Sequence, residues 1–193
     1  MSFSFIQQGE QILSSRRGIL RVTGLTLSGT AIAMLAGRES LAAGKPTKSP
    51  GKDVGILNSA LGAELEAVAA YQVGAESGLL QKPVLDLAVQ FQGHHKAHAA
   101  LLASVVSKLG GKPVLAKDKY EFPVDKLKNQ ADVLRFAATL EKGAVSAYLG
   151  AVPLFADRDL AKAAASILGD ESMHWAILLN ALGENPVPLA FMA

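Results

Sequence analysis

Histidine is rare in this chain but clustered. There are four histidines; three lie in GHHKAH at residues 93–98, and the fourth lies far downstream in DESMH at residues 170–174. Imidazole nitrogens and carboxylate oxygens are common ligands of transition metals. Glu171 and His174 are three positions apart, a spacing that places both side chains on one face of a helix. The residue types and their spacing therefore point to a metal site.

The segments that carry these residues occur twice in the same order. ELEAVAAY begins at Glu64 and EKGAVSAY begins at Glu141, with Glu, Ala, Val, Ala and Tyr at matching offsets. HKAHAALL begins at His95 and ESMHWAIL begins at Glu171. Both halves then finish alike, with LGGKPV in the first and LGENPV in the second. These matches predict a duplicated helical hairpin.

Four helical segments should position these residues. We expect them at about Asp53–Glu76 with Asp53 as N-cap, at Pro83–Gly110, at Ala131–Phe155, and from Asp157 to Gly183. Two short connections predict antiparallel hairpins, and the long link at residues 111–130 could cross the length of a bundle. The sequence thus predicts an all-α four-helix bundle.

Each helix has an apolar seam with spacings of mainly three and four residues, which marks the side that faces a bundle core. Each seam is interrupted near its middle by one or two ionisable side chains. These are Glu64 on the first seam, His95 and His98 on the second, Glu141 on the third, and Glu171 with His174 on the fourth. The six residues should therefore converge inside the core.

Three carboxylates in one core need a compensating positive charge. A buried unpaired carboxylate costs several kcal/mol, whereas the whole stability margin of a domain is roughly 5–15 kcal/mol. A metal ion compensates directly, and carboxylates with neutral imidazoles are suitable ligands. We therefore expect a metal site formed by the six seam residues.

At this point the sequence resembles the ferritin-like superfamily of four-helix-bundle metalloproteins, especially its secreted bacterial members, over about residues 53–191. The family pattern is Glu, Glu-x-x-His, Glu and Glu-x-x-His on successive helices. Five residues match it one by one: Glu64, His98, Glu141, Glu171 and His174. The resemblance implies non-haem di-iron or di-manganese redox chemistry, such as iron oxidation or the handling of peroxide or oxygen. It also leaves room for a homo-oligomer.

His95 departs from this pattern, because the family has a glutamate there. In the family that carboxylate helps to bridge two metals about 3.5–4 Å apart, a gap that an imidazole cannot bridge. Three outcomes follow from the residues. The site could hold two metals with His95 as a terminal ligand, or one iron, manganese or zinc ion. It could also have lost the metal, with histidine–glutamate pairs neutralising each other.

Other residues near the seams have more than one interpretation. His94 is off the seam and is expected to be a neighbour of the site. Tyr71 and Tyr148 are either core residues or hydrogen-bond donors to the ligands. Trp175 is expected to pack beside the site, and Glu66 to lie on the surface.

The N-terminus resembles a twin-arginine export signal. Ser15-Arg16-Arg17 opens the motif, an apolar run at residues 22–37 follows, and small residues precede a cleavage point after Ala42. The alternative is a membrane anchor, but the run is shorter than the roughly 20 apolar residues of a span. We therefore predict a signal peptide at 1–42, a linker at 43–52 and a bundle at 53–193. The expected location is the periplasm or the outside of the cell, free of the membrane.

Composition excludes several classes of protein. The chain has no cysteine, which excludes disulfides, thiolate metal sites and a cysteine nucleophile. The leader carries four arginines and two glutamates; without it, 19 basic and 17 acidic side chains become 15 of each. A neutral chain gives no indication of nucleic-acid binding. The second functional hypothesis is a non-enzymatic protein, a periplasmic metal binder or a stress-related structural bundle with a degenerate site.

Overall fold

The computed structural model describes residues 50–192, so the predicted signal peptide at 1–42 lies outside the described residues. Four long helices form the described part, and no strand occurs in it. They are α3 (Pro50–Glu76), α4 (Lys82–Lys108), α5 (Gln130–Ala151) and α6 (Arg158–Ala181). Two single 3₁₀ turns, η1 (Val124–Lys126) and η2 (Val152–Leu154), complete the secondary structure. The predicted all-α four-helix bundle is confirmed.

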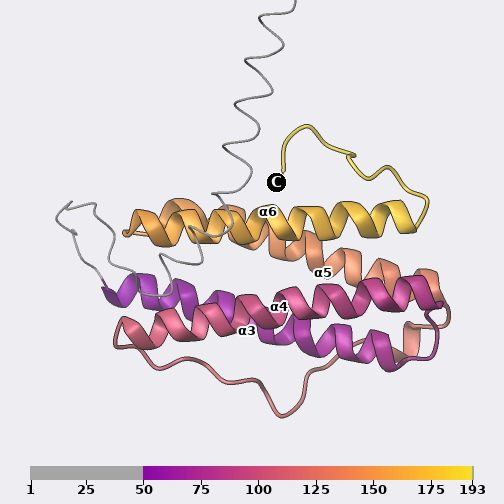
Figure 1. The fold of residues 1–193 in the computed structure, drawn as a ribbon, viewed down its shortest axis with the longest axis horizontal. Helices are drawn as coiled ribbons and strands as arrows, with labels where there is room; N and C mark the ends of the chain where they lie inside the picture. Colours follow the sequence, from indigo (N-terminus) through magenta and orange to yellow (C-terminus); the bar gives the residue numbers. More distant parts are fainter. Residues whose placement is uncertain (1–49, 193) are drawn as a thin grey trace, which may run out of the picture. The chain divides into compact units, whose positions relative to one another are not determined.

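The helices pack as two antiparallel hairpins, α3 with α4 and α5 with α6, and α3 also contacts α5 (Figure 1). Short turns close each hairpin. The segment from residue 109 to residue 129 joins the hairpins and runs along the length of the bundle (Figure 1). This is the long crossover that the sequence predicts, and it allows both halves to present their seams to one core.

Local sequence signals explain where the helices begin and end. The Asn129 side chain caps α5 by accepting from the Asp132 amide at 3.0 Å. Asp157 caps α6 by accepting from two backbone amides. Three of the helices are followed by a glycine in the left-handed region: Gly78 after α3 (φ 72°), Gly110 after α4 (φ 78°) and Gly183 after α6 (φ 74°). The repeated Leu-Gly of the sequence is thus a repeated helix end.

The start of the first helix differs from the prediction. Helix α3 begins at Pro50, inside the predicted linker, so Asp53 lies within the helix and is not its N-cap. The Asp53 carboxylate is buried and accepts hydrogen bonds from the amides of Ala156 and Asp157, at 2.9 and 3.0 Å. The prediction of Asp53 as N-cap is therefore wrong, because its carboxylate binds the backbone before α6 and not the start of α3. The third predicted helix also ends earlier, at Ala151, and continues as η2.

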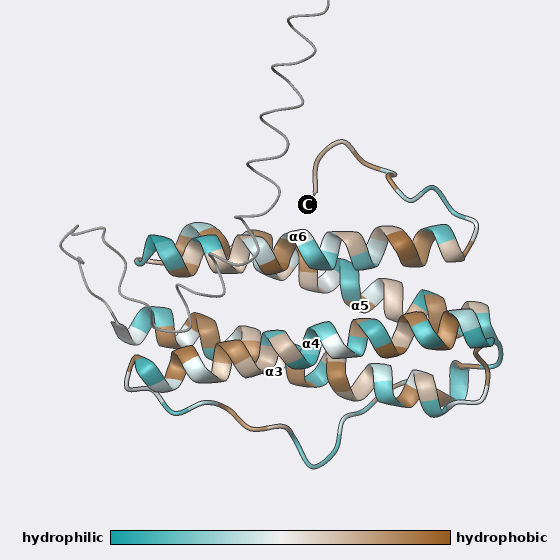
Figure 2. Ribbon diagram, in the orientation of Figure 1, coloured by the Kyte–Doolittle hydropathy of each residue, from teal (hydrophilic) through white to brown (hydrophobic). Residues whose placement is uncertain are grey.

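The predicted seams form the core. The residues of the four seams are buried, except Val68 on the seam of α3 and His98 on the seam of α4, which are partly buried. Apolar side chains pack toward both ends of the bundle: one cluster includes Phe91, Trp175 and Leu178, and the other includes Ala164 and Ile167. Hydrophilic residues interrupt the hydrophobic ones along every helix (Figure 2). On α6 the ionisable pair of the seam lies between the two apolar clusters.

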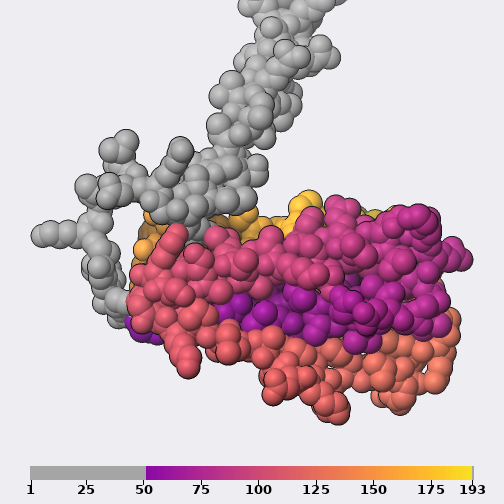
Figure 3. All heavy atoms as spheres, turned by 60° about the horizontal axis from the view of Figure 1, so that its bottom comes forward, coloured from indigo at the N-terminus to yellow at the C-terminus, as the bar shows by residue number. Residues whose placement is uncertain are grey.

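Helix α3 runs between α4 and α5 on the face shown in Figure 3. Between α3 and α5 lies a cavity of about 540 Å³; eight of its eighteen lining residues are alanine or glycine, with Ala63, Ala67 and Ala144 among them. Small side chains on both helices leave this space unfilled. Within residues 50–192, none of the helices combines the length and apolar character needed to span a membrane.

Candidate metal centre

The six seam residues predicted as ligands come together in the middle of the bundle. Helix α3 supplies Glu64, α5 supplies Glu141, and the remaining four come from α4 and α6 in pairs. Five of the six are buried and expose 3% or less: Glu64, His95, Glu141, Glu171 and His174. His98, the sixth, has a side chain that is 14% exposed. No other part of the described chain contains so many buried ionisable groups.

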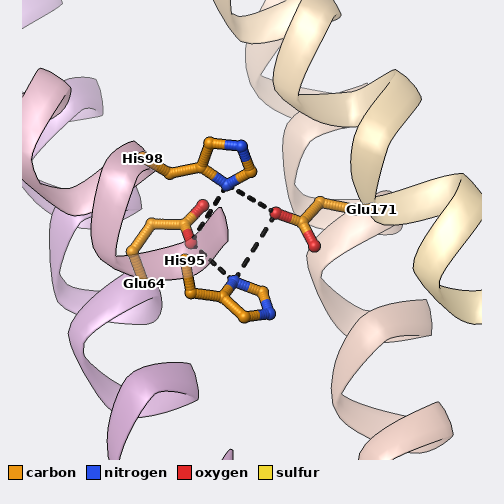
Figure 4. A group of neighbouring side chains, drawn as sticks. All are labelled: Glu64, His95, His98 and Glu171. Carbon is orange, nitrogen blue, oxygen red and sulfur yellow. Dashed lines mark hydrogen bonds and ion pairs between the residues drawn. The ribbon is translucent and has the colours of Figure 1, made fainter. Parts of the chain in front are cut away.

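The first half of this centre consists of Glu64, His95, His98 and Glu171 (Figure 4). In the figure, the two imidazole rings and the two carboxylates point toward one another from α3, α4 and α6. His98 Nδ1 lies 3.6 Å from Glu64 Oε2 and 3.1 Å from Glu171 Oε1. Four donor atoms so close together could hold one metal ion.

The second half consists of His95, Glu141, Glu171 and His174, all buried. His174 Nδ1 lies 3.4 Å from Glu141 Oε1 and 3.2 Å from Glu171 Oε2. The two halves therefore share His95 and Glu171, and each adds one glutamate and one histidine of its own. The shared position on α6 is a carboxylate, whereas the shared position on α4 is an imidazole.

His95 occupies the middle of the centre. Its Nδ1 is 2.8 Å from Glu64 Oε2 and its Nε2 is 3.2 Å from Glu141 Oε1. Both ring nitrogens can donate to carboxylates only when the ring is protonated. Burial alone would lower the pKa of His95, but the hydrogen bonds to the two carboxylates outweigh it and raise the pKa to about 10. Without a metal, His95 is therefore a cation held between two glutamates.

The carboxylates respond to burial and to the histidines in different ways. Burial opposes ionisation of Glu64, yet the hydrogen bonds from His95 and His98 prevail and lower its pKa to about 2. The pKa of Glu141 is also lowered, because His174 and His95 outweigh its burial. The pKa of Glu171 is raised, and burial is the main cause. The two unshared glutamates are thus held ionised in the metal-free protein.

Two tyrosines connect the hairpins by an exchange of partners, because each donates a hydrogen bond to the glutamate of the other hairpin. Tyr148 of α5 donates to Glu64 Oε1 of α3 at 2.6 Å, and Tyr71 of α3 donates to Glu141 Oε1 of α5 by a short hydrogen bond. Burial, together with the neighbouring carboxylate, raises the pKa of both phenols well above the usual range. They therefore remain donors. Both interpretations made from sequence are confirmed, because each tyrosine donates to a glutamate of the centre and is also buried in an apolar core cluster.

The residues present fit a metal ion. His98 Nδ1, Glu141 Oε2 and Glu171 Oε1 are buried atoms with no hydrogen-bond partner among the described residues. Although His98 Nδ1 and Glu171 Oε1 are close, their geometry is not that of a hydrogen bond. Buried polar atoms without a partner are rare and call for an explanation such as a bound ion. His98 Nδ1 and Glu171 Oε1 face each other in the centre (Figure 4), and all three are atom types that ligate iron, manganese or zinc.

One residue of the centre's surroundings was missed from sequence. Asp170, directly before Glu171, places Oδ2 at 3.4 Å from Nε2 of both His98 and His174, on the side of the rings away from the glutamates. Its position in the repeat corresponds to that of His94, which was predicted only as a neighbour. His94 Nδ1 lies 3.1 Å from Asp170 Oδ2 and 2.9 Å from His174 Nε2. Comparing the two repeats beyond the seams would have identified this pair.

Two other residues lie close to the centre. Gln92, three positions before His95, donates to the Val68 carbonyl and the Gln72 side chain. It fixes α4 to α3 and takes no part in the cluster. Trp175 is buried in the apolar core cluster nearby, as expected.

Fold and site together define a helical-bundle protein with a buried carboxylate–histidine cluster that fits metal ions. Residues 52–184 match the family model of the ferritin-like domain, so the chain belongs to the ferritin-like domain family. The chain is also similar to the crystal structure of a conserved hypothetical protein from Mycobacterium tuberculosis, with a TM-score of 0.64 and 23% identity. That similarity covers 74% of this chain and 99% of the other, and it supports the fold. A comparison with curated proteins gives no match.

Proposed function

We propose that this protein is exported and binds one or two iron or manganese ions at the six seam residues for redox chemistry on iron, peroxide or oxygen. The observation that carries the proposal is the pair of overlapping clusters that share His95 and Glu171. Each cluster combines oxygen and nitrogen donors inside a closed core, and unpartnered donor atoms face its interior. A single ion fits either cluster, and two ions fit both.

Each residue has a definable task in this proposal. Glu64 and Glu141 balance the positive charge from opposite helices, and Glu171 serves both clusters. His98 and His174 present Nδ1 to the centre. A bound iron or manganese ion would supply the electron transfer and an open coordination position. His95 has to release a proton before either of its nitrogens can act as a terminal ligand.

The tyrosines orient the carboxylates. Tyr148 holds Oε1 of Glu64, whose second oxygen contacts His95 and His98. Tyr71 holds Oε1 of Glu141, the oxygen that also lies near His95 and His174. Because each tyrosine belongs to the other hairpin from its glutamate, the two unshared carboxylates keep their orientation only when both hairpins are docked. This preorganisation lowers the cost of arranging charged ligands around an ion.

The cavity between α3 and α5 offers a route for small neutral reactants. Its lining includes Glu64, Glu141 and His95 together with both tyrosines, and the remaining walls are largely apolar. Oxygen is apolar, so an apolar passage imposes little desolvation cost on it, whereas hydrogen peroxide loses hydrogen bonds to water there. The cavity thus supports access of an oxidant to the ligand side of the centre.

Metal content tests the proposal. Protein purified aerobically from cells should contain about one or two iron or manganese ions per chain by elemental analysis. Glu141→Gln should lose metal, whereas Glu66→Gln, a matched change on α3 outside both clusters, should keep it. Protein without metal, together with no uptake on reconstitution with iron, manganese or zinc, would contradict the proposal.

Export is tested separately. Replacing Arg16 and Arg17 by lysine should keep the protein in the cytoplasm, whereas the unaltered protein should be found beyond the inner membrane after cell fractionation. The purified protein should also begin after Ala42 by mass spectrometry. Cytoplasmic protein with an intact N-terminus would contradict this part of the proposal and leave metal binding unaffected.

A non-enzymatic metal binder is the second candidate, and His95 favours it. A protonated His95 compensates the buried carboxylates without any metal. Metal-loaded protein that neither oxidises ferrous iron nor consumes peroxide faster than free metal would favour storage or a structural role. Turnover well above that of free metal would favour the redox enzyme.

A further inference from the structure

A second group of donor atoms lies on the outer side of the ligand histidines. His94 Nδ1, Asp170 Oδ2 and His174 Nε2 form a triangle with edges of 2.9, 3.1 and 3.4 Å. His174 presents its other nitrogen, Nδ1, to the inner centre. The triangle therefore lies on the opposite side of the His174 ring from the other five seam residues, where α4 faces α6.

Protons cannot satisfy all three contacts of this triangle. If both nitrogens carry a proton directed at Asp170, two N–H groups oppose each other across the 2.9 Å contact between His94 and His174. If only one nitrogen carries a proton, that single proton has to serve more than one contact. A cation in contact with all three lone pairs removes the conflict, because imidazole nitrogen and carboxylate oxygen are acceptors in their unprotonated forms.

The dimensions suit a transition-metal ion. Zinc binds histidine nitrogen at about 2.0–2.1 Å and carboxylate oxygen at about 2.0–2.2 Å. An ion at these distances can rest just above a triangle with the observed edges. Two nitrogens and one oxygen are a softer set than the glutamate-rich inner centre, and they favour zinc or copper over manganese.

The surroundings allow an ion to reach this position. The side chain of His94 is 39% exposed and that of Asp170 is 22% exposed, whereas His174 is almost completely buried. Asp170 Oδ2 also lies 3.4 Å from His98 Nε2, so one carboxylate contacts both ligand histidines. The partly exposed pair leaves a coordination position for water.

We propose that His94, Asp170 and His174 form an additional divalent-cation site of the zinc type, distinct from the inner centre and joined to it through the His174 ring. When both positions are filled, the His174 ring releases its remaining proton to solvent and bridges the two sites as an imidazolate. The competing explanation is a hydrogen-bonded group that only orients His174. The two explanations differ in whether a cation is present at His94, and this difference can be measured directly.

The experiment counts cations and identifies their ligands. Protein purified from cells is freed of metal with a chelator, then titrated with cobalt(II) or zinc and freed of excess metal by gel filtration. We expect His94→Ala to hold one cation fewer per chain than the unaltered protein. Asp86→Asn, an exposed aspartate of α4 paired with Lys82, is the control and should hold the full number.

The inner centre is followed in parallel with Glu141→Gln. This variant should lose an inner cation but keep the one that His94→Ala removes, so failure of the inner centre and failure of the outer site give different results. In the cobalt protein, proton NMR should show a paramagnetically shifted His94 ring signal that disappears in His94→Ala, while signals of other ligand histidines remain. Circular dichroism checks that each variant is folded.

Equal cation counts in His94→Ala and the unaltered protein would overturn the proposal, as would a cobalt protein without a shifted His94 signal. His94→Asp provides a second test, because a carboxylate at this position still supplies a donor. It should hold more cation than His94→Ala. If the two variants hold the same reduced amount, position 94 acts through the orientation of His174 and the proposed site is wrong.

Discussion

The segments GHHKAH of α4 and DESMH of α6 occupy equivalent positions in the two hairpins but carry different donors. The last histidine is shared, since His98 corresponds to His174. The positions three and four residues earlier differ, since His95 corresponds to Glu171 and His94 corresponds to Asp170. The fold thus preserves the geometry of a duplicated site while the sequence changes its charge. Helix α4 contributes no carboxylate to either face of the site, and helix α6 contributes one to each.

This asymmetry gives His95 a double character. As an imidazolium ion it compensates Glu64 and Glu141 in the metal-free protein, and as a neutral ring it can be a ligand. Glu171 has no such alternative, because a carboxylate can only attract a cation or take up a proton. Mutation of Glu171 should therefore mainly lower metal affinity, whereas mutation of His95 should mainly lower the stability of the metal-free protein.

Loss of the shared carboxylate should have the largest effect on metal affinity. Glu171→Gln removes the anionic ligand common to both clusters, so we expect metal affinity to fall by about 100-fold or more, since even loss of an outer-shell partner costs 10–100-fold. Isothermal titration with manganese or cobalt measures the change. An affinity within a few-fold of the unaltered protein would show that Glu171 is not a shared ligand.

Making the two segments alike should destabilise the metal-free protein. His95→Glu replaces a buried cation by a fourth buried carboxylate, and breaking a buried ion pair costs about 3–5 kcal/mol. Urea unfolding without metal should show a loss of this size, and added metal should reverse most of it. His95→Gln, which adds no charge, should lose less. Equal stability of His95→Glu and the unaltered protein without metal would contradict the role of His95 as an internal cation.

The pH dependence should reflect the same pair of positions. The folded pKa of His95 is about 10 against 6.5 for a free histidine, so its stabilisation is complete below pH 6.5 and is lost as the pH rises through 10. The folded pKa of Glu64 is about 2 against 4.5, so its stabilisation is present above pH 4.5 and is lost as the pH falls through 2. Metal-free protein should thus be most stable between about pH 4.5 and 6.5.

Losses on the alkaline side should be on the order of a few kcal/mol, measured by urea unfolding at each pH. In His95→Gln the loss of stability at alkaline pH should be smaller, because one of the histidines with a raised pKa is gone. Metal affinity should increase over the same range, since a ligand histidine has to be neutral. A stability that stays constant from pH 6.5 to 10 would contradict the ion pairs described for His95.

The smallest effects should come from the exchanged tyrosines. Tyr71→Phe and Tyr148→Phe each remove a donor from a buried carboxylate, a change worth about 1–3 kcal/mol. Because Tyr71 serves Glu141 and Tyr148 serves Glu64, the two losses should be similar. Thermal unfolding of both variants measures this. A loss confined to one of them would show that the two hairpins are not equivalent at this level.

Much of the fold could be predicted because helical spacing is a local property. The seams identified Glu64, Glu141 and the four residues on α4 and α6, and the duplication predicted that they would meet. The long crossover was likewise evident from its prolines and its length. These features depend on residues a few positions apart, or on the repetition of one segment by another.

Features that depend on contacts between the hairpins were not predictable in the same way. Asp53 has the properties of an N-cap, but its partners at Ala156 and Asp157 are about a hundred positions away. Tyr71 and Tyr148 could be recognised as candidates, yet the exchange of their glutamate partners depends on how the hairpins cross. Asp170 lies off the apolar seam, so the spacing of the seam residues does not identify it.

The hydrogen bonds of Asp53 have a consequence for the order in which the protein is made. Asp53 emerges from the ribosome about a hundred residues before Ala156 and Asp157, whose amides its carboxylate binds. During this interval the Asp53 carboxylate lacks these partners. A nascent chain that has not yet released α6 can neither close the bundle nor form either cluster, because Glu171 of α6 belongs to both clusters.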